Sequence, residues 1–185
     1  TRNCIRAQIM PRLIEMNPQA EAHIQKTADI MKEAESYIGR QTKKAAETCV
    51  SIHGDDILIR KEPFETQDPL IKKQVLKLAL EQAAGAMQDI TTVHPQKTYT
   101  KWFDYDKIKS DLSARTRKEG DYICCNEEGK TQKLKKYFVN EKVEAKERGR
   151  IPLLAEGAHI LWIVGYRIST YYKISQETKR ILEVR

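Results

Sequence analysis

The sequence predicts an α+β fold in which an N-terminal helical module precedes a small α+β module. Apolar residues recur at helical spacing through much of residues 18–94, whereas short apolar runs separated by turn residues follow residue 99. The halves also differ in charge: residues 1–95 contain 13 basic and 13 acidic residues, and residues 96–185 contain 20 basic and 13 acidic residues. We therefore expect three segments, 1–17, 18–94 and 99–185.

The first segment, residues 1–17, predicts a short amphipathic helix. Ile5, Ile9 and Leu13 repeat at helical spacing, and Pro11 should kink or interrupt the helix because it lacks a backbone N–H. The chain starts at Thr1, without a methionine and within a helical pattern, so we expect it to be a fragment of a longer protein.

The second segment begins with a long helix. Asn17-Pro18 is a typical helix start, and an amphipathic pattern follows as far as Cys49, with Gly39 as a position where the helix could break. After it, His53–Asp56 predicts a turn, and Ile57–Ile59 predicts a short strand or an apolar tether.

A second long helix is predicted from Asp68-Pro69 to Gly85 or Met87, because a capping residue and proline precede a regular apolar pattern. We expect the two long helices to pack as an antiparallel hairpin.

Residues 99–185 predict strands around one short helix. Residues 99–106 and the apolar runs 151–154 and 160–164 are typical of strands, and Glu156-Gly157 predicts a tight turn between the last two. Residues 133–142 predict an amphipathic helix. Its apolar side should consist of Leu134, Tyr137, Phe138 and Val139.

Composition argues against membrane, secretory and metal-binding classes. No apolar run approaches the roughly 20 residues that span a bilayer, and no secretory leader opens the chain. The cysteines Cys4, Cys49, Cys124 and Cys125 lack C-x-x-C spacing and a nearby histidine cluster. We expect reduced thiols in a cytoplasmic protein and no metal site.

The basic excess of the second half favours a surface for a polyanion, because neutralised phosphates release counterions. The alternative is a set of solvated lysines that serve solubility. The candidate phosphate-binding residues are Arg115, Arg117, Lys118, Lys133, Lys135 and Lys136, followed by Arg148, Arg150 and Arg167. Arg150 has Glu144 and Glu147 as alternative partners, and Arg167 is equally suited to a structural salt bridge.

Four strings in this half carry a resemblance to a known family. RTRKEGD, KLKKYFVNEK, ERGRIPLL and WIVGYRIS follow one another between Arg115 and Ser169. In this order and spacing they resemble the carboxy-terminal domain of bacterial tRNA(Ile)-lysidine synthases. The resemblance extends over residues 99–185 and, less closely, over the first eighteen residues.

The resemblance implies an ATP-dependent ligase that attaches lysine to the wobble cytidine of an isoleucine tRNA with a CAU anticodon. In this family ATP, with Mg, and lysine bind the catalytic domain, and the C-terminal domains hold the tRNA. This chain lacks the S-G-G-x-D-S loop and the G-x-x-x-x-G-K-[ST] loop. We therefore expect no catalytic residue and no bound cofactor in this chain, which alone should be inactive.

The resemblance also assigns roles outside the basic module. Arg2, Asn3 and Arg6 would lie at the edge of the catalytic domain, near the nucleotide and the anticodon; the alternative is that they are ordinary helix-surface residues. The middle module would contribute to tRNA binding through Lys72, Lys73 and Lys77, or these lysines form a solvated face.

Residues 93–100 depart from the family's pattern, because relatives have a further helix and a hairpin at this point. Either this member is shorter there or the sequence joins segments around missing residues.

A second function remains open: a protein-interaction or homodimerisation module whose basic face serves solubility. Ionic strength discriminates between the two, because phosphate binding weakens steeply with salt and a hydrophobic interface does not.

Overall fold

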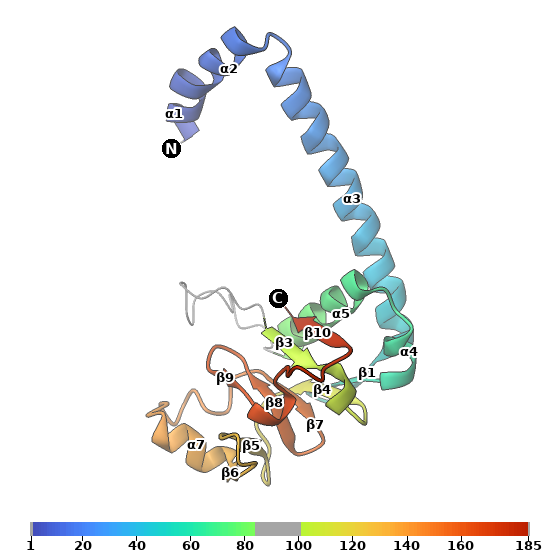
Figure 1. Cartoon of the computed structure of the whole chain (residues 1–185), viewed down its shortest axis with the longest axis vertical. Coiled ribbons are helices and arrows are strands. Elements are labelled where there is room, and N and C mark those ends of the chain that lie inside the picture. Colours follow the sequence, from blue (N-terminus) through green and yellow to red (C-terminus); the bar gives the residue numbers. More distant parts are fainter. Residues whose placement is uncertain (1, 84–100, 185) are drawn as a thin grey trace. The chain divides into compact units, whose positions relative to one another are not determined.

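The computed structural model describes residues 2–83 and 101–184, without the side chain of Arg2. The chain divides into two compact units, Thr1–Gln41 and Thr42–Arg185. Figure 1 shows the elements of both.

The first unit is helical. α1 spans Arg2–Cys4, a π-helical segment η1 spans Ile5–Ile9, and α2 spans Met10–Met16. Pro11 lies in the first turn of α2, where its missing N–H costs no hydrogen bond, directly after the wider π turn. The sequence predicts a kink or an interruption at Pro11; the structure instead has a π-helical segment before Pro11, and residues 2–16 stay helical without a break.

The long helix α3 spans Ala20–Cys49 and begins in the first unit. Its start is set by Asn17, whose Oδ1 accepts a hydrogen bond from the Gln19 amide at 3.0 Å, as the sequence predicts. The helix continues through Gly39 without a break. None of the described side chains before Thr42 is buried, so the apolar stripe of this part of α3 is open to solvent.

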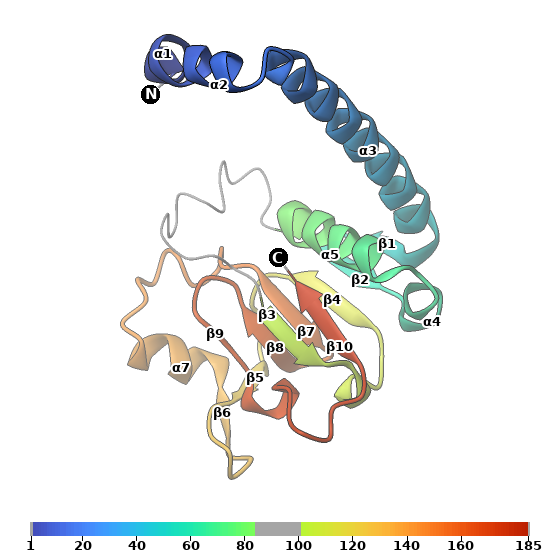
Figure 2. The same cartoon turned by 45° about the horizontal axis from the view of Figure 1, so that its top comes forward.

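The second unit is built on an eight-stranded sheet with the order β1-β2-β4-β7-β8-β5-β6, and β9 pairs with β8. Its strands are β1 Val50–His53, β2 Asp56–Ile59, β4 Leu112–Arg115, β5 Tyr122–Cys124, β6 Thr131–Lys133, β7 Leu153–Glu156, β8 His159–Ile163 and β9 Arg167–Ile168. All pairs are antiparallel except β5 with β8. A separate ribbon pairs β3 (Lys101–Asp104) with β10 (Ile181–Val184), and Figure 2 shows it in front of the main sheet.

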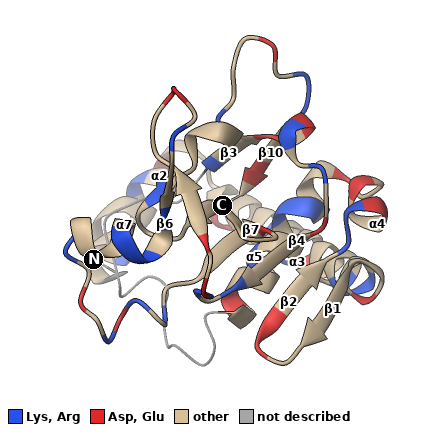
Figure 3. Ribbon diagram, turned by 90° about the horizontal axis from the view of Figure 1, so that it is seen from below, with Lys and Arg blue, Asp and Glu red and all other residues tan. Residues whose placement is uncertain are grey.

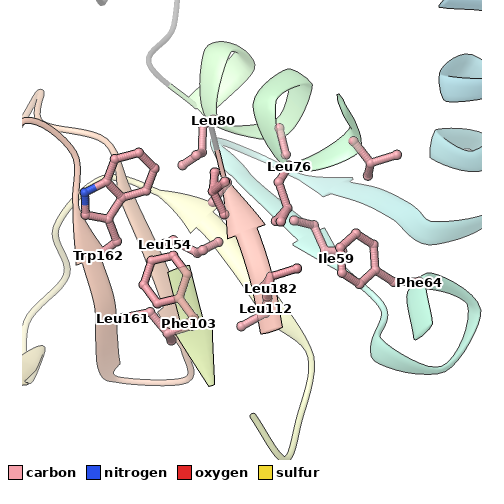
Figure 4. Close-up of a cluster of buried hydrophobic side chains, with 14 of the residues drawn as sticks. Ile59, Phe64, Leu76, Leu80, Phe103, Leu112, Leu154, Leu161, Trp162 and Leu182 are labelled. Atoms are coloured by element: carbon pink, nitrogen blue, oxygen red, sulfur yellow. The ribbon is translucent and has the colours of Figure 1, made fainter. Parts of the chain in front are cut away.

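Helices cover this sheet. They are α4 Lys61–Glu65, α5 Pro69–Ala83 and α7 Leu134–Asn140, with 3-10 turns η2 Tyr105–Lys107 and η3 Thr170–Tyr172. Two clusters of buried hydrophobic residues pack these helices against the sheet. The α5 cluster includes Leu76, Phe103 and Leu154 (Figure 4), and the α7 cluster includes Phe138 and Leu153. Because Leu153 and Leu154 are neighbours in β7, they project to opposite faces, so the clusters fill the two faces of the sheet.

The predicted helical hairpin is wrong. α5 packs on β2, β4 and β10 instead, and its Val75, Leu76, Ala79 and Leu80 are buried in the α5 cluster together with Cys49 at the end of α3. Leu58 in β2 pairs with Ser113 in β4, so residues 50–59 are part of the main sheet.

The compact units therefore differ from the segments expected from the sequence. Residues 42–83 join residues 101–184 in one unit, rather than forming a separate helical module that ends at residue 94. The physical reason is that α5 buries its apolar face against the sheet, which leaves no separate core for a helical module. The end expected at Gly85 or Met87 and the departure at residues 93–100 lie outside the described residues.

Several local predictions for the second unit are confirmed. A turn at Gly54-Asp55 joins β1 to β2, and a turn at Gly157-Ala158 joins β7 to β8. The helix predicted at 133–142 is observed as α7, with Leu134, Tyr137 and Phe138 buried. Val139 was placed on the wrong side, because it is 52% exposed.

Candidate nucleic-acid interface

The centre of the basic region is an acidic residue, Asp121. Arg115 donates from Nη1 to its Oδ2 and from Nη2 to its Oδ1, both at 2.8 Å. Arg115 also donates to the carbonyl oxygens of Gly157, at 2.8 Å, and Thr116, at 3.0 Å. The guanidinium is buried with all these partners inside the fold. Arg115 is therefore a structural residue, and its predicted place on a phosphate-binding surface is corrected.

Asp121 also joins the basic turn to the basic helix. Its Oδ2 accepts from the Lys118 amide at 2.8 Å, which folds residues 116–121 around the carboxylate. Its carbonyl oxygen accepts from the amide of Leu134, the first residue of α7, at 2.7 Å. Gly120 allows the turn because its φ of 90° is unfavourable for residues with a side chain. One residue thus fixes the connection between β4 and β5 against the start of α7, and we call these two segments, residues 116–121 and 133–136, the Asp121 frame.

Four cations on this frame are exposed and form no ion pair within the described residues: Arg117, Lys133, Lys135 and Lys136. Figure 3 shows the basic residues of α7. Lys118 differs, since it forms an ion pair with Asp56 of β2 while its side chain stays 53% exposed.

The other three arginines of the predicted set serve different purposes. Arg148 donates from Nε to the Val143 carbonyl at 2.8 Å, so it braces the loop after α7. Arg167 donates to the Cys125 carbonyl at 3.0 Å and lies 6.0 Å from the centre of the Tyr137 ring. Its partners are thus a carbonyl and an aromatic ring rather than a carboxylate. Arg150 is exposed, and Glu144, one of its two possible partners, instead pairs with Lys146.

The remaining predicted residues lie elsewhere. Asn3 and Arg6 are exposed in the helices of the first unit, and the side chain of Arg2 lies outside the described part of the structure. In α5, Lys73 pairs with Glu183 of β10 at 2.6 Å, and Lys77 approaches Glu81 within 4.0 Å. Lys72 lies 5.6 Å above the Tyr105 ring. These three lysines all have neighbours within the fold.

An aromatic group centred on His159 was not predicted as a unit. Its ring contacts those of Tyr122, Tyr171 and Tyr172, with centroid distances of 4.8, 5.3 and 4.8 Å. Burial lowers the pKa of His159, and the nearby carboxylate of Glu156 opposes this. These residues lie in three separate elements, β5, β8 and η3, so the group becomes visible only in the folded structure.

The described residues offer neither a metal centre nor a membrane span. No group of three or more histidine, cysteine, aspartate or glutamate side chains in residues 2–83 and 101–184 could hold a metal ion. No helix in the same residues is both long and apolar enough to cross a bilayer.

Comparison with known proteins places this basic module in a family. Residues 112–184 match the family described as the TilS substrate C-terminal domain. The chain is homologous to the carboxy-terminal part of tRNA(Ile)-lysidine synthases. The matched residues include the Asp121 frame, α7 and the group around His159.

Curated tRNA(Ile)-lysidine synthases match different lengths of the chain. The one from Caldanaerobacter subterraneus is 34% identical over 139 residues, which cover 70% of this chain and 29% of the relative. That from Clostridium acetobutylicum is 41% identical over 85 residues, covering 46% of this chain and 18% of the relative. That from Dehalococcoides mccartyi is 23% identical over 261 residues, covering 99% of this chain and 55% of the relative.

These relatives are longer than the parts that match. The three matches span between 18% and 55% of their lengths. A crystal structure of a TilS C-terminal domain is 28% identical and covers 49% of this chain and 75% of the crystallised chain, with a TM-score of 0.38.

Proposed function

We propose that this chain is the tRNA-binding carboxy-terminal portion of a tRNA(Ile)-lysidine synthase. The observation that carries the proposal is the family match over residues 112–184, a segment that also holds the four exposed cations of the Asp121 frame. The whole protein would join lysine to the wobble cytidine of an isoleucine tRNA with a CAU anticodon. In that reaction ATP adenylates the cytidine, and the amine of lysine then displaces AMP.

The geometry of the cations suits a double-stranded RNA. Proteins recognise A-form RNA mainly through its phosphates and 2′-hydroxyls, because the base edges of its deep groove are out of reach. Arg117 and Lys133 are held close to Asp121 by its hydrogen bonds, and Lys135 and Lys136 follow in the first turn of α7. Cations on a rigid frame bind phosphates with less loss of side-chain and backbone entropy than cations on a mobile loop.

The chemistry is assigned to the part of the relatives that this chain does not match. The sequence has no phosphate-binding glycine loop, and the described residues have no group suited to a metal ion. ATP with Mg, and lysine, would therefore bind outside this chain, whose own residues would hold and orient the tRNA.

A titration of the chain with the isoleucine tRNA that carries a CAU anticodon tests this proposal, with initiator tRNA as the competitor. A variant with Arg117, Lys133, Lys135 and Lys136 changed to alanine removes the four exposed cations without touching Arg115. A matched control changes four other exposed lysines, Lys43, Lys44, Lys173 and Lys179, and so loses the same charge.

Binding should weaken steeply between low and moderate salt, because each phosphate contact contributes roughly 0.7–0.9 to the logarithmic salt slope. The four-residue variant should lose most of the affinity and show a smaller slope, while the control keeps both. Equal losses of RNA affinity in the two variants would show that net charge alone causes the effect, and would reject the assigned surface. Salt-insensitive self-association without RNA binding would favour the protein-interaction alternative.

A further inference from the structure

Three neighbouring strands place a cation and two aromatic rings in one row. His159 in β8 pairs with Tyr122 in β5, and Tyr122 pairs with Lys133 in β6. Residues that pair directly across strands project from the same face of a sheet. The rings of Tyr122 and His159 are stacked, with centroids 4.8 Å apart and planes inclined by 22°. The row therefore runs Lys133, Tyr122, His159 along the sheet face opposite α7.

Tyr171 extends this row at the surface. Its ring centroid lies 5.3 Å from that of His159, and 47% of the residue is exposed. The ring of Tyr172 contacts the ring of Tyr171 edge-on, with the centroids 4.9 Å apart and the planes at 86°. Tyr172 is itself fixed, because its hydroxyl donates to Glu156 Oε2 at 2.6 Å. Tyr171 thus presents a ring whose orientation is set by two neighbours.

Burial and hydrogen bonds account for Tyr172 and His159, whereas Tyr171 packs on both of them and keeps nearly half of its surface exposed. Tyr172 is 1% exposed, and His159 contacts Ser169 Oγ through Nε2 at 3.1 Å. Among the hydrogen bonds of the described residues, none uses the Tyr171 hydroxyl. A half-exposed aromatic ring supported on other rings, with a lysine in the same row, is the arrangement with which proteins bind single-stranded nucleic acid.

We propose that Tyr171, supported by His159 and Tyr122, stacks on an unpaired base of the bound RNA while Lys133 contacts a phosphate of the same single-stranded segment. This inference rests on the proposed function, since it requires that the chain binds RNA. The base must be unpaired, because neighbouring bases cover both faces of a base inside a duplex. Stacking needs no particular base, since every base has a π face.

The test compares two RNA duplexes of the same sequence, each annealed from two strands so that neither contains a loop. One ends blunt, and the other carries a short single-stranded 3′ extension that contains the fluorescent adenine analogue 2-aminopurine. The whole chain is titrated with each RNA as the original protein and as Tyr171→Ala and Tyr171→Phe. Tyr37→Ala serves as the matched control, because Tyr37 is 56% exposed and belongs to the first unit rather than to this row.

The extended RNA should bind about tenfold more tightly than the blunt RNA, and the 2-aminopurine fluorescence should be quenched on binding. Tyr171→Ala should abolish both effects and leave the affinity for the blunt RNA unchanged, which also shows that the variant is folded. Tyr171→Phe and Tyr37→Ala should keep both effects. Equal binding of the two RNAs, or an advantage that survives in Tyr171→Ala, would reject the stacking site while RNA binding stands. Absence of binding to either RNA would instead reject the proposed function, and the stacking site with it.

Discussion

Arg115 and Asp121 form a two-point ion pair inside the second unit, with both N–O distances at 2.8 Å. Their side chains are only 4% and 2% exposed. The strand β4 contributes the arginine, and the residue before β5 contributes the aspartate, so the pair closes the basic turn between the two strands. The turn that presents Arg117 to solvent is thus organised by a buried pair.

Removal of one partner should destabilise the fold strongly. Arg115→Ala leaves the Asp121 carboxylate buried without its partner, and breaking a buried pair in this way costs about 3–5 kcal/mol. Arg115→Lys should restore only part of the loss, because an ammonium group cannot donate two parallel hydrogen bonds. Urea unfolding followed by circular dichroism measures both. A loss below about 1 kcal/mol for Arg115→Ala would show that the pair is dispensable.

Glu156 should make the fold sensitive to acid. Burial raises the pKa of Glu156, but hydrogen bonds from the Tyr172 hydroxyl and from the amides of Ser110 and Lys109 outweigh it, so the pKa lies below its ordinary value of 4.5. A carboxylate with a lowered pKa stabilises the folded state above its unfolded pKa, and this stabilisation is lost as the pH falls through the folded pKa. Stability should therefore decline with acidification below about pH 4.5.

The Glu156→Gln variant isolates this contribution. It should be less stable than the original protein at pH 7, and the difference should shrink as the pH falls below the ordinary value of 4.5, because glutamine does not titrate. Urea midpoints at a series of pH values measure the difference. A constant gap across the series would assign the acid sensitivity to other carboxylates.

Gly120 should be hard to replace. Its φ of 90° lies in a region that residues with a side chain rarely adopt, although a Cβ added there would have no heavy atom of another residue within 4 Å. Gly120→Ala should therefore cost about 1–2 kcal/mol through backbone strain alone. Gly149 is the matched control, because its added Cβ is equally unobstructed and its φ is not positive. Gly149→Ala should leave the free energy of unfolding unchanged or raise it slightly. Urea unfolding compares the two variants, and equal midpoints would show that the turn accepts a side chain at residue 120.

Local patterns in the sequence predicted local structure well. The spacing of Leu134, Tyr137 and Phe138 placed α7 and its buried side, and only Val139 was assigned to the wrong face. Asn17 was recognised from the role that its side chain favours at a helix start, and Glu156-Gly157 was recognised as a turn. In these cases neighbours within a few residues decide the outcome.

The features that the sequence did not predict depend on contacts between residues that are far apart in the sequence. Charge alone made Arg115 a candidate for phosphate binding, but its burial depends on Asp121 and on Gly157 in the turn after β7. The row of His159 and Tyr122 likewise exists because β5 pairs with β8 in parallel, and no spacing in the sequence encodes that pairing. The prediction of a helical hairpin was wrong for the same reason. An amphipathic pattern shows that α5 buries one face, but it does not show which element covers that face.

The position of α5 predicts that residues 42–83 and the sheet unfold together. Leu76 is fully buried in the α5 cluster, which also contains Trp162 of β8. Leu76→Ala should destabilise the unit by about 2–5 kcal/mol, because it leaves a cavity. Neither tryptophan lies in α5, because Trp162 is in β8 of the main sheet and Trp102 is in β3 of the ribbon, so their fluorescence reports on the strands.

The urea midpoint measured by tryptophan fluorescence should fall in Leu76→Ala together with the midpoint measured by circular dichroism. Leu70→Ala provides the matched control on the same helix, because Leu70 is 43% exposed and its truncation should change the midpoint little. If the tryptophan midpoint stayed in place while circular dichroism showed early loss of helix, α5 would belong to a separate helical module. A shared shift would instead mean that the sheet and the helix form one cooperative unit, because a cavity beneath α5 can lower the stability of the strands only if the two share a core.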